Sequence, residues 1–104
     1  MSTYAKVLPV PDDTSRAYWE GARRHRLTIL RCSACGLWIH YPRPDCPRCA
    51  ATALEPTAVS GRGTVYTFTR SHYVGGPGFE HETPYVIMIV ELEEQPGVRI
   101  VSNL

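Results

Sequence analysis

The chain has 104 residues and a mass of 11.7 kDa, which is enough for one ordinary domain or two very small ones. Eleven basic and ten acidic side chains leave a formal net charge of +1, which argues against a protein that binds chiefly by neutralising many nucleic-acid phosphates. Nine prolines and eight glycines argue against a compact helical bundle and predict a mostly β chain with many turns.

No segment has the pattern of an export signal or a membrane span. Residues 1–14 are mixed and polar, without the apolar stretch of a secretory signal. The longest apolar run, residues 85–90, is far shorter than the roughly 20 residues that cross a bilayer. We therefore expect a cytoplasmic protein without a membrane partner, whose four cysteines stay reduced and serve as metal ligands rather than disulfides.

The first segment, residues 1–26, is expected to hold a short amphipathic helix from Asp12 to Arg26. Pro11 precedes it, and the carboxylate of Asp12 or Asp13 can accept hydrogen bonds from the free amides of the first turn. This segment is too short to be stable alone, so it needs a surface to pack on.

The apolar stripe of this helix is narrow, because Tyr18 and Trp19 share a side with Ala22 only. Gly21 lowers the helix propensity by about 1 kcal/mol relative to alanine. We expect Tyr18 and Trp19 to seat the helix on a neighbouring element; the alternative is that they lie in a subunit interface.

The second segment, residues 27–57, contains the cysteines. Residues 27–31 and 37–41 are candidate strands, and the prolines that follow exclude regular structure up to Cys49. Trp38, beside the first cysteine pair, is expected to pack within this segment.

Two C-x-x-C motifs lie ten residues apart, Cys32 with Cys35 and Cys46 with Cys49. A two-residue spacer lets both thiolates of a motif face one ion, and two motifs provide the four tetrahedral sulfurs that zinc prefers. Such a site has no open coordination position, so the spacing predicts a structural Zn²⁺ ribbon. The alternatives are a redox dithiol and a rubredoxin-type iron site with the same ligands.

The residues next to these motifs refine the expectation. Gly36 follows the first motif and can adopt the positive φ that such a turn favours, whereas Ala50 stands at the equivalent position of the second. The second turn is therefore expected to be less regular. His40 is close in sequence, but with four cysteines present we interpret it as a strand residue and not a ligand.

The third segment, residues 58–104, is rich in β-branched and aromatic residues. Its expected elements are strands at 64–71, 85–92 and 98–104, a loop at 73–83 and a turn at 93–97. Three strands do not close a barrel, so we expect an incomplete OB-type sheet that another chain or further residues complete. An open sheet edge favours binding of a partner.

A series of short motifs then follows one order along the chain: Tyr18-Trp19-Glu20-Gly21, Leu27, Arg31 to Gly36, Tyr41-Pro42-Arg43, Cys46 to Cys49 and Ser60 to Thr67. This order resembles the zinc-ribbon plus OB-fold proteins that accompany thiolase-like enzymes, the acyl-CoA-associated OB-fold proteins. The resemblance implies an N-terminal helix, a rubredoxin-like zinc ribbon and a C-terminal OB barrel. The family barrel needs more strands than follow Ser60 here.

The resemblance also implies a function. It suggests a non-catalytic accessory subunit that forms a hetero-oligomer with a thiolase-superfamily enzyme, namely a thiolase, an acyltransferase or a lipid-transfer-protein-like retro-aldolase. The partner would act on acyl-CoA substrates, with bacterial steroid side-chain degradation as one setting, and a coenzyme A thioester would be shared with it.

Four arginines are candidates for binding that coenzyme: Arg23, Arg24 and Arg26 at the expected helix end, and Arg43 beside the ribbon. A guanidinium group is well shaped for phosphate. The alternative is a solvated cationic end that complements the helix dipole.

Two other functions compete with this interpretation. Tyr66 and Phe68, two residues apart on an expected strand, could stack the bases of a single-stranded nucleic acid. His81 and Glu80 could transfer protons, but no nucleophile accompanies them and adjacent loop residues are poorly preorganised. A docking role for the loop at 72–81, with its aromatic residues, is the preferred interpretation.

Overall fold

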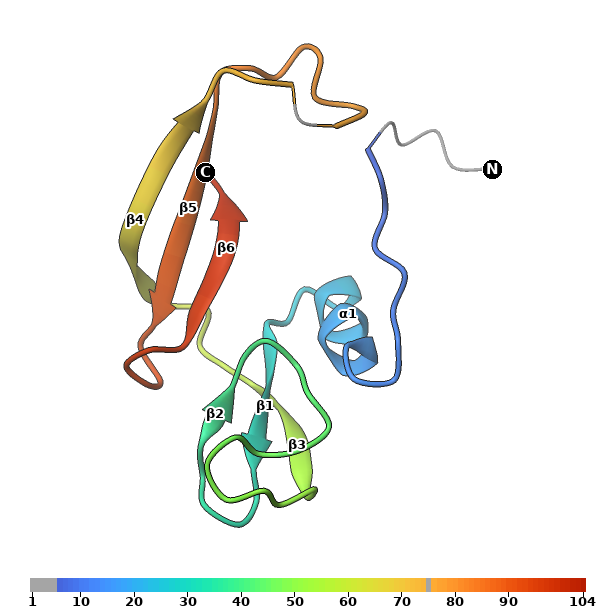
Figure 1. The fold of residues 1–104 in the computed structure, drawn as a ribbon, viewed down its shortest axis with the longest axis vertical. Helices are drawn as coiled ribbons and strands as arrows, with labels where there is room; N and C mark the ends of the chain where they lie inside the picture. The colour runs from blue at the N-terminus through green and yellow to red at the C-terminus, as the bar shows by residue number, and fades with distance from the viewer. Residues whose placement is uncertain (1–5, 75) are drawn as a thin grey trace.

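The computed structural model describes residues 6–74 and 76–104 (Figure 1). Within them, one short helix precedes two antiparallel sheets that lie at opposite ends of the molecule. The elements are α1 (Arg16–Arg23), β1 (Thr28–Cys32), β2 (Trp38–Ile39), β3 (Leu54–Ala58), β4 (Gly63–Ser71), β5 (Tyr85–Leu92) and β6 (Arg99–Asn103).

The first turn before α1 is closed by reciprocal hydrogen bonds. Asp12 Oδ1 accepts from the backbone amides of Thr14 at 3.1 Å and Ser15 at 2.8 Å, while Ser15 Oγ accepts from the Asp12 amide at 3.1 Å. This is the arrangement of a capping box. Asp12 therefore caps the turn as expected, although the regular helix begins only at Arg16.

The helix ends three residues earlier than expected, because the chain reverses at His25. His25 has a φ of 60° and donates its amide to the carbonyl of Ala22 at 3.0 Å, and the amide of Arg26 reaches the carbonyl of Gly21 at 2.8 Å. This pair of bonds is a Schellman motif, which satisfies the last carbonyls of a helix and turns the chain out of it.

Gly21 is required by packing. The helix lies against β1 and β3, and a Cβ at Gly21 would overlap the side chain of Thr28 and lie 3.0 Å from the carbonyl oxygen of Arg26. Gly21 therefore lowers the intrinsic stability of the helix but allows α1 to pack closely against β1, and this packing holds the helix in place.

The ribbon sheet has the order β2-β1-β3, and β3 was not expected from the sequence. Its five residues pair with β1 from Thr28↔Ala58 to Cys32↔Leu54, with Pro56 opposite Leu30. A proline cannot donate to a ladder, so it is tolerated here because β3 is an edge strand.

The second sheet has the order β4-β5-β6, close to the three expected strands, and it does not close into a barrel. The register of β4 against β5 shifts between Val65 and Thr67, where a β-bulge inserts Tyr66. Every residue of β4 except Ser71 is exposed. The expected incomplete OB-type sheet is thus observed.

The two sheets share one hydrophobic cluster, which we call the junction core: Ile29, Leu92, Val98 and Ile100, with Tyr18, Leu27, Trp38 and Val59 against them. A second cluster inside the ribbon contains Ile39 and two of the cysteines. On β1, Ile29 belongs to the junction core, whereas Leu30 and Cys32, on alternate positions, belong to the ribbon cluster.

Tyr18 of α1 packs on the junction core, which agrees with its expected role as an anchor for the helix, although no residue of α1 is fully buried. Trp38 packs on the junction core too, and not only within the ribbon as expected. In the part of the chain that the structure describes, no helix is long and apolar enough to cross a membrane.

Candidate metal centre

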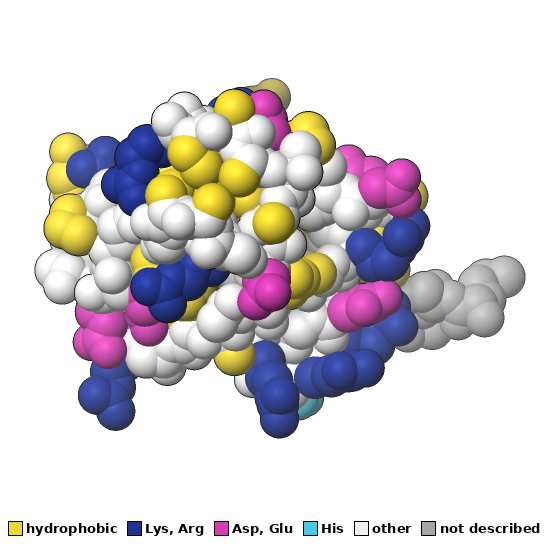
Figure 2. Space-filling model, turned by 90° about the horizontal axis from the view of Figure 1, so that it is seen from below, with side chains coloured by type: hydrophobic (Ala, Val, Ile, Leu, Met, Phe, Trp, Pro, Cys, Tyr) yellow, Lys and Arg dark blue, Asp and Glu magenta, His cyan; other side chains and the backbone are white. Residues whose placement is uncertain are grey.

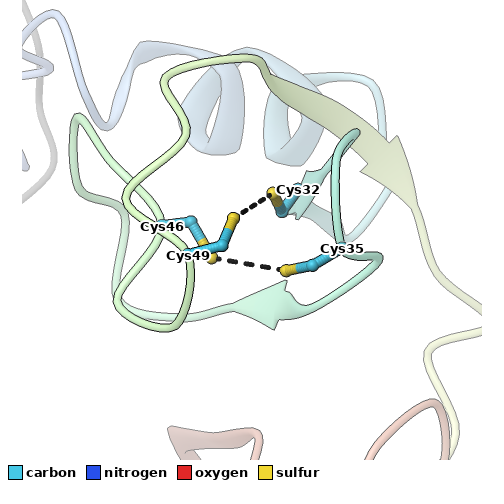
Figure 3. Close-up of side chains that lie close together, drawn as sticks. All are labelled: Cys32, Cys35, Cys46 and Cys49. Carbon is cyan, nitrogen blue, oxygen red and sulfur yellow. Dashed lines mark hydrogen bonds between the residues drawn. The ribbon is translucent and has the colours of Figure 1, made fainter.

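The four cysteine sulfurs converge between the two C-x-x-C turns (Figure 3). Their Sγ atoms lie within 4.8 Å of one another, and the shortest separations, 3.6 Å, join Cys32 to Cys49 and Cys35 to Cys46. Four sulfurs at about 2.3 Å from a central zinc would be about 3.8 Å apart, whereas a disulfide needs about 2 Å. The spacing therefore fits a tetrahedral ion.

The two turns have the same backbone hydrogen bonds. The amide of Gly36 donates to the carbonyl of Cys32 at 2.8 Å, and the amide of Ala50 donates to that of Cys46 at 2.9 Å. Gly36 has a φ of 78° and Ala50 a φ of 64°. The expectation of a less regular second turn was wrong: Ala50 accepts the left-handed conformation, at a cost of about 1 kcal/mol, because the turn demands it.

Backbone amides point at the sulfurs and favour their charged form. The Leu37 amide is the main cause that lowers the pKa of Cys35 to about 6, and the Cys35 amide lowers the pKa of Cys32. At Cys49 the Ala51 amide acts in the same direction, but the neighbouring Cys32 sulfur and burial outweigh it and raise the pKa to about 12.

The raised pKa of Cys49 has a different cause from the lowered ones, namely the neighbouring sulfurs together with burial. Four sulfurs this close cannot all be ionised without a cation among them, because like charges disfavour one another. A divalent metal removes that repulsion. The donor set therefore fits the ion that the spacing predicts.

Sequence reasoning missed Arg48, which lies inside the second C-x-x-C motif. Its guanidinium Nη2 donates to the carbonyl of Cys35 at 2.9 Å. The position of a basic residue between two candidate ligands, Cys46 and Cys49, was visible in the sequence. The motif spacing could not show that the Arg48 side chain reaches Cys35 of the first motif.

His40 lies outside the four-sulfur cluster. Its ring is 5.5 Å from that of Tyr18 and 4.4 Å from that of Tyr41, between centroids. Nδ1 of His40 is buried without a hydrogen-bond partner in the described structure, and burial lowers the pKa of His40.

The candidate coenzyme A residues are all exposed, but they occupy different places. Arg23 closes α1, Arg24 and Arg26 flank its reversal, and Arg43 lies on the ribbon loop, where it donates to Asp45 at 3.1 Å and 3.3 Å. Figure 2 shows the Lys and Arg side chains of the ribbon end in separate groups around hydrophobic ones. The grooves that include Arg43 include none of the other three.

The β-bulge separates Tyr66 from Phe68. Phe68 pairs with Met88 and shares an apolar groove with Val65, whereas the Tyr66 ring packs 3.8 Å from the guanidinium carbon of Arg99, on the opposite face. Strict alternation would have placed both rings on one face. The expected pair of stacking platforms is not formed.

The loop between β4 and β5 leaves His81 and Glu80 exposed. Tyr73 is exposed as well, but Phe79 stacks on Tyr85 at 5.1 Å between centroids and lies under Lys6 at 4.8 Å. Phe79 therefore packs within the molecule, and Tyr73 is the loop aromatic residue that is exposed.

Both halves of the chain match known protein families. Residues 19–55 match the ChsH2 rubredoxin-like zinc ribbon domain, and residues 56–104 match the ChsH2 C-terminal OB-fold domain. A solved structure, the Ltp2-ChsH2(DUF35) aldolase, matches with a TM-score of 0.80 and 36% identity, over 92% of this chain and 72% of that one.

Three curated relatives agree with this match. They are a probable enoyl-CoA hydratase alpha subunit of Thermomonospora curvata (42% identical over 85% of this chain), a DUF35 domain-containing scaffold protein of Methanocaldococcus jannaschii (42% over 78%) and the benzoylsuccinyl-CoA thiolase subunit BbsA of Geobacter metallireducens (32% over 94%). The chain spans 27%, 56% and 58% of their respective lengths. Given the matched ribbon, the matched OB-fold and the shared arrangement of both, this chain belongs to the ChsH2 (DUF35) family.

Proposed function

We propose that this chain is a non-catalytic accessory subunit that binds a thiolase-superfamily enzyme acting on acyl-CoA thioesters. The observation that carries the proposal is the agreement of ribbon and OB-type sheet together with the ChsH2(DUF35) aldolase structure. The names of two relatives, a thiolase subunit and a scaffold protein, support the same role. Steroid side-chain degradation, which the family resemblance implies, is the setting that we include in the proposal.

In this proposal the metal is structural zinc, held by Cys32, Cys35, Cys46 and Cys49. Bound there, zinc would supply folding free energy and no open position for a substrate. The chain's own residues shape the site, because the two turns have the same backbone hydrogen bonds and backbone amides favour the charged forms of Cys32 and Cys35. The chemistry would therefore reside in the partner.

The open sheet supports a role in assembly. β4 is exposed along both of its faces, with Val65 51% and Phe68 69% exposed, so these two apolar side chains are largely uncovered in the isolated chain. Large apolar side chains uncovered along a whole strand are typical of a surface that another protein covers.

Coenzyme A binding is the finer part of the proposal. Arg23, Arg24 and Arg26 form no ion pair among the described residues, so their charges are available to phosphates of a thioester shared with the partner. Arg43 forms an ion pair with Asp45 and would have to give up that contact to bind a phosphate of coenzyme A. Replacing Arg23, Arg24 and Arg26 together by alanine should raise the Kd for coenzyme A of the assembled complex, whereas Arg62→Ala, at an exposed position outside both the helix end and β4, is the control.

The experiment that tests the main proposal is native mass spectrometry of the chain coexpressed with a candidate thiolase-superfamily partner. A complex that carries one zinc per copy of this chain is the expected result. Two separate species, one of them a lone zinc-bearing chain, would contradict the accessory role. In that case oligonucleotide binding, measured at low and high salt, is the next assay.

A further inference from the structure

Arg48 contacts both halves of the metal centre, the second turn through its backbone and the first turn through its side chain. Its backbone amide donates to Sγ of Cys46 at 3.4 Å, within the second turn. Its guanidinium Nη2 crosses to the first turn and donates to the carbonyl of Cys35 at 2.9 Å. The side chain therefore connects the second turn to Cys35, 13 residues earlier in the chain.

The charge of this guanidinium is not matched by a carboxylate. Among the described residues, the ion pairs involve Lys6, Arg16 and Arg43, and Arg48 forms none. Its side-chain partner is a neutral carbonyl oxygen. The guanidinium charge is therefore available to offset the charge of the neighbouring thiolates.

A site of four thiolates around a divalent ion keeps a net charge of about −2, which a nearby fixed cation stabilises. Residues that contact metal ligands from outside commonly change metal affinity by about 10–100-fold when they are replaced. Arg48 meets both conditions: it contacts a ligand residue and it brings the compensating charge.

We propose that Arg48 is a positioning residue of the zinc centre, which holds the two C-x-x-C turns together and offsets the negative charge of the thiolates. This inference rests on the proposed function, because it requires that the four cysteines bind zinc. It adds that zinc retention depends on a residue that is not a ligand.

The same loop offers a matched control. Arg43 carries the same charge and is also exposed, but it donates both of its hydrogen bonds to Asp45 and not to a cysteine residue. Arg43→Ala therefore removes one positive charge from the ribbon without touching the sulfurs.

The test compares the wild-type chain with Arg48→Ala, Arg48→Gln, Arg48→Lys and Arg43→Ala. Zinc affinity is measured by competition with a chromophoric chelator, and the absorption spectrum of the cobalt(II) form reports tetrahedral thiolate coordination. We expect Arg48→Ala to bind zinc about 10-fold more weakly with an unchanged cobalt spectrum. Arg43→Ala should stay within about twofold of the wild type.

Arg48→Lys and Arg48→Gln separate charge from hydrogen bonding and keep the test valid if Arg48→Ala does not fold. The lysine retains the charge, so it should bind zinc more tightly than the glutamine, and the difference should shrink at high salt. Equal affinities for Arg48→Ala and Arg43→Ala, or for Arg48→Lys and Arg48→Gln, would overturn the inference alone. A wild-type chain that binds no zinc would overturn both this inference and the proposed zinc centre.

Discussion

The side-chain amide of Gln95 forms two hydrogen bonds with the backbone of Trp38, one accepted and one donated, in the way that a neighbouring β-strand would. The Trp38 amide donates to Oε1 of Gln95 at 3.0 Å, and Nε2 of Gln95 donates to the Trp38 carbonyl at 3.1 Å. Trp38 opens β2 of the ribbon, and Gln95 lies in the turn between β5 and β6. One side-chain amide thus connects the two sheets at residues 57 positions apart.

Replacing Gln95 by alanine should lower the free energy of unfolding by about 1–3 kcal/mol, because both partly buried polar groups of Trp38 lose their partners. Urea denaturation of the purified chain measures this change. Glu93→Ala, at an exposed position of the same turn, is the control and should be nearly neutral. An equal loss in both variants would show that the turn, and not the amide pair, is responsible.

Gly21→Ala should destabilise the protein by about 1–3 kcal/mol, although alanine favours a helix more than glycine does. The added methyl group would meet the Thr28 side chain and the Arg26 carbonyl, so α1 must move away from β1. The thermal midpoint of the variant is the measurement. Gly76→Ala, where a Cβ would meet nothing within 4 Å, is the control. A more stable Gly21→Ala variant would mean that helix propensity outweighs the contact.

Cys32→Ser should abolish stoichiometric zinc binding and unfold the ribbon, because the four-sulfur site has no spare ligand. Binding of structural zinc contributes roughly 10–16 kcal/mol in small modules, more than a chain of this size can lose. Native mass spectrometry gives the metal content, and copurification gives partner binding. Ser33→Ala, one residue away and exposed, should retain both. A Cys32→Ser chain that keeps its fold and its partner would contradict the structural role of the metal.

The stability of the protein should fall below pH 6.5 in part because of His40. Burial lowers the pKa of His40 in the folded state, so the unfolded chain takes up the proton first as the pH falls. The contribution of neutral His40 is therefore complete above 6.5, its ordinary value, and is lost as the pH falls toward the lowered one.

The measurement compares urea midpoints of the wild type and His40→Phe at about pH 8 and about pH 5.5. The phenylalanine variant should lose less stability on acidification than the wild type, and any loss of zinc by acid is common to both. His81→Phe, on the exposed loop, is the control for changing a histidine as such. Parallel pH profiles for the wild type and His40→Phe would contradict the assignment.

Features with a local cause were predictable from the sequence. The strands β4, β5 and β6 follow from alternation and β-branched residues, and the convergence of Cys32, Cys35, Cys46 and Cys49 follows from motif spacing. The cap at Asp12 follows from side-chain chemistry. In each case residues close together in the sequence provide the signal that predicts the feature.

Features with a long-range cause were not predictable. β3 contains Pro56, which argues against a strand unless the strand is known to lie at an edge. The bulge at Tyr66 places Phe68 on the face opposite Tyr66, whereas the strict alternation assumed from the sequence would place both rings on one face. The reach of Arg48 to Cys35 depends on the packing of one turn against the other.

β1 is a strand of five residues whose two sides belong to different hydrophobic clusters: Ile29 faces the junction core and Cys32 faces the metal centre. A strand this short cannot remain ordered on one side while the other side melts. Removal of the metal should therefore loosen the OB-type sheet as well, and heating should give one cooperative transition rather than two. In that sense, metal binding on one side of β1 would help to order the OB-type sheet that packs on its other side.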